Sequence, residues 1–101
     1  MSKNPETKFK EKVVEILDEI PGVWILKTQE RARRGVPDLL ICIRGRFVAI
    51  ELKTDEGEVD PLQEVILQRI RQAQGLAFVT SPSRWPAHLQ MIRDILRKGD
   101  F

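Results

Sequence analysis

The sequence predicts a single α/β domain in which one mixed β-sheet is flanked by helices. Three observations predict this class. Apolar residues recur at helical spacing near the start, and three short β-forming runs lie within residues 23–54. A capped helix, a strand and a final helix follow. The length of 101 residues suits one domain with a single modest core, and we expect that domain to span residues 1–101.

The first expected element is a helix over residues 4–20. Its apolar residues form one stripe of period 3.6, made of Phe9, Val13, Ile16, Leu17 and Ile20. Pro21 and Gly22 end this helix. Residues 23–27 (VWILK) are then typical of a short strand, and residues 28–35 (TQERARRG) of a polar, basic loop.

A β-hairpin is expected next, from residues 36–43 (VPDLLICI) and 46–54 (RFVAIELKT). The two runs meet at Arg44 and Gly45, and glycine provides the positive φ that a tight turn needs. A turn centred between these two residues pairs Cys42 with Phe47, Leu40 with Ala49 and Asp38 with Glu51.

The second helix carries clear start signals. Asp60 is the expected N-cap, Pro61 fits the first helical position, and Gln63 stands where a capping box places Glu or Gln. Gly75 suits the C-terminal cap. The expected buried stripe consists of Leu62, Ile66, Ile70 and Ala73.

Two elements complete the chain. Residues 76–80 (LAFVT) predict a fourth strand, and residues 85–98 predict a last helix that tolerates Pro86 in its first turn. The element order is therefore α-β-β-β-α-β-α around one mixed sheet.

Composition excludes several classes of protein. Cys42 is the single cysteine, so an intramolecular disulfide is excluded, and one histidine makes a zinc site improbable. We expect Cys42 to be a small buried hydrophobe within the run LLICI. No apolar run approaches the roughly 20 residues of a membrane span, and the polar start lacks a secretion signal, so a cytoplasmic protein is expected.

Positive charge gathers in the middle of the chain. The net charge is only +2, but residues 27–46 contain six positive residues and only two acids. These six are Lys27, Arg31, Arg33, Arg34, Arg44 and Arg46. A local basic patch suits contacts with phosphates, although a solvated loop with scattered arginines explains the charge equally well.

The hairpin also gathers charged groups that could perform chemistry. Asp38 and Glu51 would face each other with Cβ atoms roughly 4.5–5.5 Å apart, and Lys53 would lie on the same face. Opposed like charges destabilise a sheet, and a divalent cation such as Mg²⁺ would offset them. A mundane ion pair would be the better interpretation of Glu51 and Lys53 alone; the position of Asp38 favours the metal site.

Two further residues have two interpretations each. Glu6 lies within about 40° of the centre of the first helix's apolar stripe, given a ~100° step per residue. It is either a carboxylate favoured by the helix dipole or a ligand directed at the sheet. Gln63 either caps its helix or belongs to the site.

The run RGVPDLLICIRGRFVAIELK followed by DPLQ resembles the VRR-NUC family of the PD-(D/E)xK nuclease superfamily, in its stand-alone phage and bacterial form. The resemblance extends from about Glu6 to Val79. It implies a restriction-endonuclease-like core and a Mg²⁺- or Mn²⁺-dependent endonuclease that leaves 5′-phosphate ends. Stand-alone members look like homodimers that cut four-way DNA junctions.

The resemblance also implies residue roles. Asp38 and Glu51 would be metal carboxylates, the backbone carbonyl of Leu52 a further ligand, and Lys53 the catalytic lysine. The family's acid on the first helix and glutamine on the second match Glu6 and Gln63. Family members often carry Ser or Thr shortly before that glutamine, whereas this chain has Asp60-Pro61-Leu62, which keeps the N-cap chemistry.

Three functions remain open at this point. The first is a metal-dependent endonuclease acting on branched DNA as a dimer, with a surface around Met91 and Leu96 as a candidate interface. The second is a non-catalytic DNA-binding module, which the acids argue against because binding a polyanion gains nothing from them. The third is an interaction domain that binds no nucleic acid, for which the basic loop would be incidental.

Overall fold

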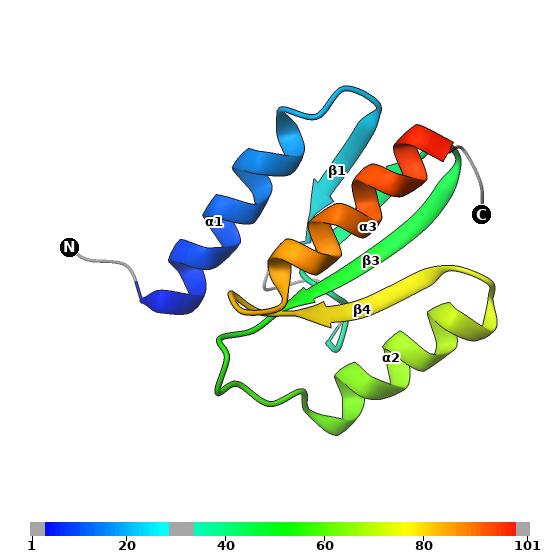
Figure 1. Ribbon diagram of the computed structural model, residues 1–101. Helices are drawn as coiled ribbons and strands as arrows, with labels where there is room; N and C mark the ends of the chain where they lie inside the picture. Colours follow the sequence, from blue (N-terminus) through cyan, green and yellow to red (C-terminus); the bar gives the residue numbers. More distant parts are fainter. Residues whose placement is uncertain (1–3, 29–33, 99–101) are drawn as a thin grey trace.

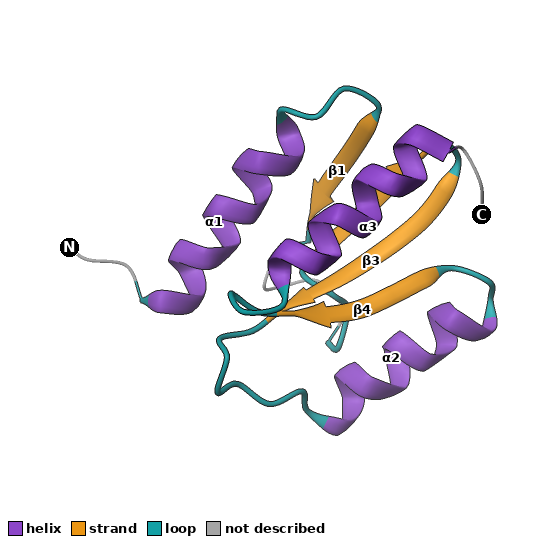
Figure 2. Cartoon of the chain, in the orientation of Figure 1, coloured by secondary structure: helices purple, strands orange, loops and turns teal. Residues whose placement is uncertain are grey.

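The computed structural model describes residues 4–28 and 34–98 as a four-stranded sheet with helices on both faces (Figure 1). Figure 2 shows the same arrangement by type of element. In chain order the elements are α1 (Pro5–Asp18), β1 (Val23–Lys27), β2 (Leu39–Ile43), β3 (Arg46–Leu52), α2 (Pro61–Gln72), β4 (Leu76–Thr80) and α3 (Trp85–Lys98). The expected fold class and element order are confirmed. No helix within these described ranges is long and apolar enough to cross a membrane.

The sheet is mixed and its strands follow sequence order, β1-β2-β3-β4. β1, β2 and β3 are antiparallel neighbours, whereas β4 runs parallel to β3 because α2 returns the chain to the same end of the sheet. The expected hairpin register is confirmed, with Cys42 opposite Phe47 and Leu40 opposite Ala49. Arg44 (φ 51°) and Gly45 (φ 81°) both take left-handed conformations, as the common two-residue hairpin turn requires.

α1 and α3 cover one face of the sheet and form the main core with it. The apolar stripe of α1 contributes Phe9, Val13 and Leu17, and α3 contributes Trp85 and Ile92. The strands contribute alternate residues, as the two-residue period of a strand demands. These strand residues are Leu39, Ile41, Ile43, Val48, Ile50 and Leu52.

α2 covers part of the opposite face, over β3 and β4. Its buried residue is Leu67, which packs on the small side chains of Ala49 and Ala77. The expected stripe of α2 was therefore wrong at two positions, because Leu62 and Ala73 are exposed. The side of α2 that carries Leu67 packs on the two alanines. Leu62 lies on a different side of the helix and is therefore exposed.

In the part of the chain that the structure describes, no helix covers the remainder of this second face, over β1 and β2. A row of side chains runs across it from Trp24 through Cys42 to Phe47, in directly paired positions. Cys42 is exposed, so its expected burial was wrong. The reason is strand alternation: Ile41 and Ile43 point into the core, and Cys42 between them must point away from it.

The helix ends follow local capping chemistry. Asn4 caps α1 by accepting from the Thr7 amide at 2.8 Å, and Asp60 and Gln63 form the expected capping box of α2. The end of α2 differs from the prediction, since Gln74 takes the left-handed conformation with φ 73°. Glycine is needed at position 75 for space, because a Cβ there would lie 2.8 Å from Cγ2 of Ile70.

Candidate active site

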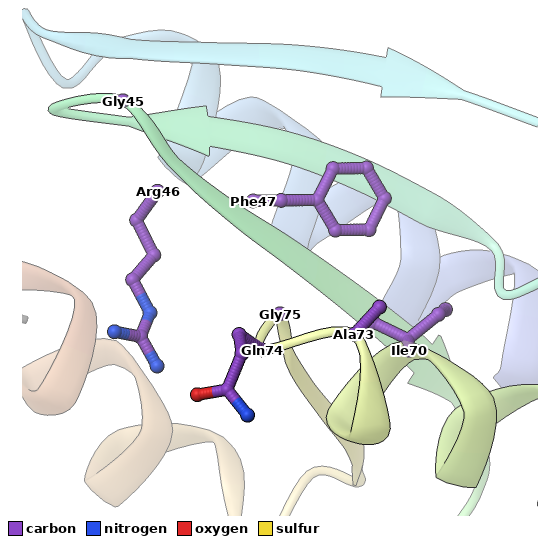
Figure 3. Close-up of a pocket in the computed structure, with 7 residues that line it drawn as sticks. All are labelled: Gly45, Arg46, Phe47, Ile70, Ala73, Gln74 and Gly75. Atoms are coloured by element: carbon purple, nitrogen blue, oxygen red, sulfur yellow. The ribbon is translucent and has the colours of Figure 1, made fainter.

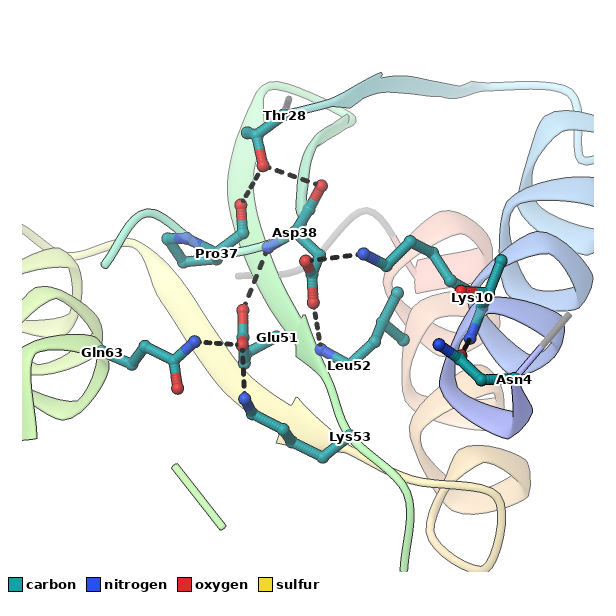
Figure 4. A network of polar contacts seen from close by, with 10 residues as sticks. Asn4, Lys10, Thr28, Pro37, Asp38, Glu51, Leu52, Lys53 and Gln63 are labelled. Carbon is teal, nitrogen blue, oxygen red and sulfur yellow. Dashed lines mark hydrogen bonds and ion pairs between the residues drawn. The ribbon is translucent and has the colours of Figure 1, made fainter. Parts of the chain in front are cut away.

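Two carboxylates meet where β2 begins and β3 ends (Figure 4). Asp38 immediately precedes β2, and Glu51 lies near the end of β3, so the hairpin register brings them together. The backbone amide of Asp38 donates to Oε1 of Glu51 at 3.2 Å. In turn, the backbone amide of Leu52 donates to Oδ2 of Asp38 at 2.9 Å. These two bonds fix the carboxylates relative to the sheet backbone.

Lys53 and Gln63 complete the surroundings of Glu51. The Nζ atom of Lys53 lies 3.3 Å from Oε2 of Glu51, and Nε2 of Gln63 donates to the same oxygen at 2.6 Å. The Glu51 residue is only 3% exposed. The structure therefore brings together four of the residues that the sequence singled out: Asp38, Glu51, Lys53 and Gln63.

Gln63 fills both of the roles that the sequence left open. Its Oε1 accepts from the Asp60 amide at 3.1 Å, which is the capping-box bond, while its Nε2 donates to Glu51. A side-chain amide has an acceptor and a donor on separate atoms, so one residue can serve both partners. The start of α2 is thereby tied directly to the acid pair.

The surroundings of Glu51 disfavour the charged form of its carboxylate. Burial, and next the neighbouring charge of Asp38, raise the pKa of Glu51 to about 7, although Lys53 acts in the opposite direction. A buried acid with a raised pKa is a group that a bound cation would stabilise in its charged form. The donor set of two carboxylates near a strand-end carbonyl fits a hard divalent cation, which prefers oxygen ligands.

Lys10 is a member of the site that the sequence did not single out. Its Nζ lies 3.0 Å from Oδ1 of Asp38, across 28 positions of sequence. Burial alone would lower the pKa of Lys10, but its surroundings raise it overall. The raising groups are acids: Asp38 by hydrogen bond and charge, and Glu6 and Glu51 by charge. Helical spacing could have found Lys10, because it follows Glu6 by four residues.

Glu6 is half-buried in the first turn of α1 and acts on Lys10 through its charge. Within residues 4–28 and 34–98, no three side chains of Asp, Glu, His or Cys lie close enough together to hold an ion. The structure thus brings two carboxylates together and leaves Glu6 outside a ready-made ligand cluster. Two carboxylates are a usual number for Mg²⁺, which keeps waters in its remaining positions.

Among the described positive residues that were expected to contact DNA, Lys27 and the two hairpin arginines lie at different ends of the sheet. Arg31 and Arg33 lie outside the described residues. Lys27 ends β1 opposite Leu39, so it lies at the same end of the sheet as the acid pair. Arg44 and Arg46 lie at the other end of β2, roughly 15 Å away by the rise of a five-residue strand. A single basic patch over all six residues is therefore not formed, because the hairpin carries two of them away.

A cavity of about 460 Å³ opens at this far end of the sheet, between the hairpin turn and the end of α2 (Figure 3). It is lined by Gly45, Arg46, Phe47, Ile70, Ala73, Gln74 and Gly75. None of the described residues that line it is acidic, so these residues offer no carboxylate to a metal ion. The acid pair of Asp38 and Glu51 lies at the opposite end of the sheet.

The fold and the site together define an α/β domain with two carboxylates and two ammonium groups at one end of a mixed sheet. A solved structure described as a VRR_NUC domain is similar to it, with a TM-score of 0.69 and 22% sequence identity. The match covers 94% of this chain and 97% of that chain. No family model and no curated protein matches the sequence. The chain has the fold of a VRR_NUC domain, and this confirms the restriction-endonuclease-like core that the resemblance implied.

Proposed function

We propose that this protein is a metal-dependent nuclease that hydrolyses phosphodiester bonds in DNA. The observation that carries the proposal is the pair formed by Asp38 and Glu51, held by backbone amides beside Lys53. The pair occurs in a fold shared with a VRR_NUC domain, which gives the chemistry a precedent. A protein that only bound DNA would gain nothing from two acids turned towards a polyanion.

Asp38 and Glu51 would hold Mg²⁺ or Mn²⁺, with the backbone carbonyl of Leu52 as a third oxygen. When bound, a divalent cation neutralises charge on the phosphodiester and lowers the pKa of a water nucleophile. The resemblance also implies Glu6 as a ligand, but the proposal rests on the two carboxylates that lie together.

The other residues of the site would hold Glu51 in position or neutralise negative charge on the phosphate. Lys53 is anchored on β3 and lies 3.3 Å from Glu51, so its ammonium can neutralise charge that develops on a phosphate at the site. Gln63 holds Oε2 of Glu51 and is a positioning residue. Lys27 lies at the same end of the sheet and would contact a flanking phosphate.

The substrate that we propose is branched DNA, cut by a homodimer. Two sites related by a two-fold axis match the symmetry of a four-way junction. The exposed apolar side chains favour the open sheet face as the contact between copies, since Trp24 is 62% and Phe47 45% exposed. The earlier candidate around Met91 and Leu96 is less suitable, because Leu96 packs against the core.

The proposal predicts metal-dependent cleavage that Asp38→Asn abolishes. Labelled four-way junction, flap and linear duplex are incubated with Mg²⁺, Mn²⁺ or EDTA, and products are resolved on denaturing gels. We expect cleavage only with metal, strongest on the junction, and a loss of at least a hundredfold in Asp38→Asn with DNA binding retained.

Asp18→Asn is the matched control, because Asp18 is an exposed acid at the end of α1. It should cleave like the unchanged protein. Binding without cleavage of any substrate would establish a DNA-binding module instead, and full cleavage by Asp38→Asn would remove the assigned role of the acid pair.

A further inference from the structure

Each oxygen of the Asp38 carboxylate already has a partner, and the two partners differ in kind. Oδ2 accepts from the backbone amide of Leu52, which the sheet holds in place. Oδ1 accepts from Nζ of Lys10, at the end of a flexible side chain. Oδ1 of Asp38 can therefore exchange the Lys10 ammonium for another cation without disturbing the sheet.

We propose that Lys10 is a resident counter-cation, which holds Asp38 in the metal-free protein and is displaced when a divalent cation binds. This inference rests on the proposed function, because it concerns the same metal site. It assigns to Lys10 a positioning role, distinct from the role of Lys53, whose ammonium contacts Glu51.

The charges around Lys10 support this role. Its ammonium lies 3.0 Å from Oδ1 of Asp38, and the charges of Glu6 and Glu51 also act on it. A divalent cation would seek the same place for the same reason. A divalent cation bound at Oδ1 of Asp38 would repel the ammonium that lies 3.0 Å from the same oxygen, and this repulsion favours movement of the ammonium away from the site.

The surroundings of Lys10 allow that movement. Its side chain is 35% exposed and lines a groove of about 350 Å³ between α1 and the end of β1. α1 itself stays anchored through Phe9 and Val13, so only the lysine side chain has to rotate. Glu6, one turn earlier on the helix, offers the released ammonium a partner at the favourable Glu-to-Lys spacing of four residues.

The first test measures metal binding without DNA. Lys10→Met keeps the apolar stem of the side chain and removes the ammonium. We expect its Mn²⁺ dissociation constant, by isothermal titration calorimetry, to fall about threefold or more, since competition and repulsion both disappear. The melting temperature without metal should also fall, because the acid pair loses a neutralising charge.

Lys12→Met is the matched control, an exposed lysine on the same helix with the same change in net charge. Its Mn²⁺ affinity should match that of the unchanged protein. Equal or weaker Mn²⁺ binding in Lys10→Met overturns the inference and leaves the nuclease proposal standing. Absence of Mn²⁺ binding in the unchanged protein overturns both, which makes the two failures distinguishable.

A second measurement is made on the unchanged protein and does not depend on the metal affinity of any variant. The lysine ammonium groups are observed by NMR, with the Lys10 signal assigned from its absence in Lys10→Arg. Saturating Mg²⁺ should move or broaden the Lys10 ammonium signal while that of Lys12 stays in place. An unchanged Lys10 signal at saturation would show that the ion pair with Asp38 persists, and would overturn the inference.

Discussion

Glu51 is the residue at which stability conflicts most directly with the proposed function. It is buried beside a second acid, and its pKa is raised to about 7, so the charged form is unfavourable in the metal-free protein. An apolar residue at the same strand position would face no such penalty. Buried groups with shifted pKa values cluster at functional sites, so this unfavourable charge next to Asp38 supports the proposed role of Glu51.

Glu51→Gln should change the pH dependence of stability in a defined direction. The unfolded glutamate titrates near 4.5 and the folded one near 7, so the folded state binds the proton more tightly. As pH rises from 4.5 to 7, the free energy of unfolding of the metal-free protein therefore falls relative to that of the variant, by up to about 3 kcal/mol. Above pH 7 the difference between the two proteins stays constant.

Urea unfolding of both proteins at several pH values in EDTA measures this difference. Glu15→Gln, at an exposed position of α1, serves as the control and should run parallel to the unchanged protein. A free-energy difference between Glu51→Gln and the unchanged protein that stays constant over this pH range would show that Glu51 titrates normally.

Among the elements, α2 is joined to the site through its first turn. Its capping box fixes the first turn, and the same turn presents Gln63 to Glu51. Because one side chain serves both contacts, the placement of the helix and the orientation of the acid are coupled. The hairpin of β2 and β3 provides the other half of the site through its register, which opposes Asp38 and Glu51.

Two substitutions in α2 should separate the capping role from the site role. Asp60→Ala removes the N-cap and should cost about 1 kcal/mol of stability while the metal-induced rise in melting temperature persists. Gln63→Ala should also lower that metal-induced rise and slow cleavage at least fivefold, because Oε2 of Glu51 loses a donor. Gln68→Ala, at an exposed position of the same helix, is the control. Equal metal responses in all three variants would leave Gln63 with a capping role alone.

At the scale of the whole molecule, the two faces of the sheet differ in how much of each the helices cover. One face is buried under α1 and α3, whereas α2 covers only part of the other. The uncovered part carries the paired row Trp24, Cys42 and Phe47 beside Leu26. A connected apolar surface of this kind is typical of an interface between proteins, and a second copy of the chain is the partner that we propose.

Trp24→Gln should shift this protein towards the monomer, whereas Met91→Gln, on the face first considered, should not. Sedimentation equilibrium at several concentrations measures the dimer dissociation constant, which we expect to rise at least tenfold in Trp24→Gln. Cys42 gives an independent readout, because it lies directly opposite Trp24 and should react with a thiol reagent more slowly as the dimer forms. Dimerisation lost in Met91→Gln and kept in Trp24→Gln would place the interface on α3.

The sequence by itself determined the order of the elements, the hairpin register and the meeting of Asp38 with Glu51. These features depend on local signals, namely periodicity, turn residues and caps, which act over a few positions. Only the tertiary structure decided that Leu67 rather than Leu62 is buried, that Cys42 is exposed, and that Lys10 pairs with Asp38. Strand alternation places Cys42 on the face opposite Ile41 and Ile43, but the docking of the helices decides which face is covered. The burial of Leu67 and the pairing of Lys10 also depend on helix docking, which is set by the shapes of surfaces that are distant in sequence.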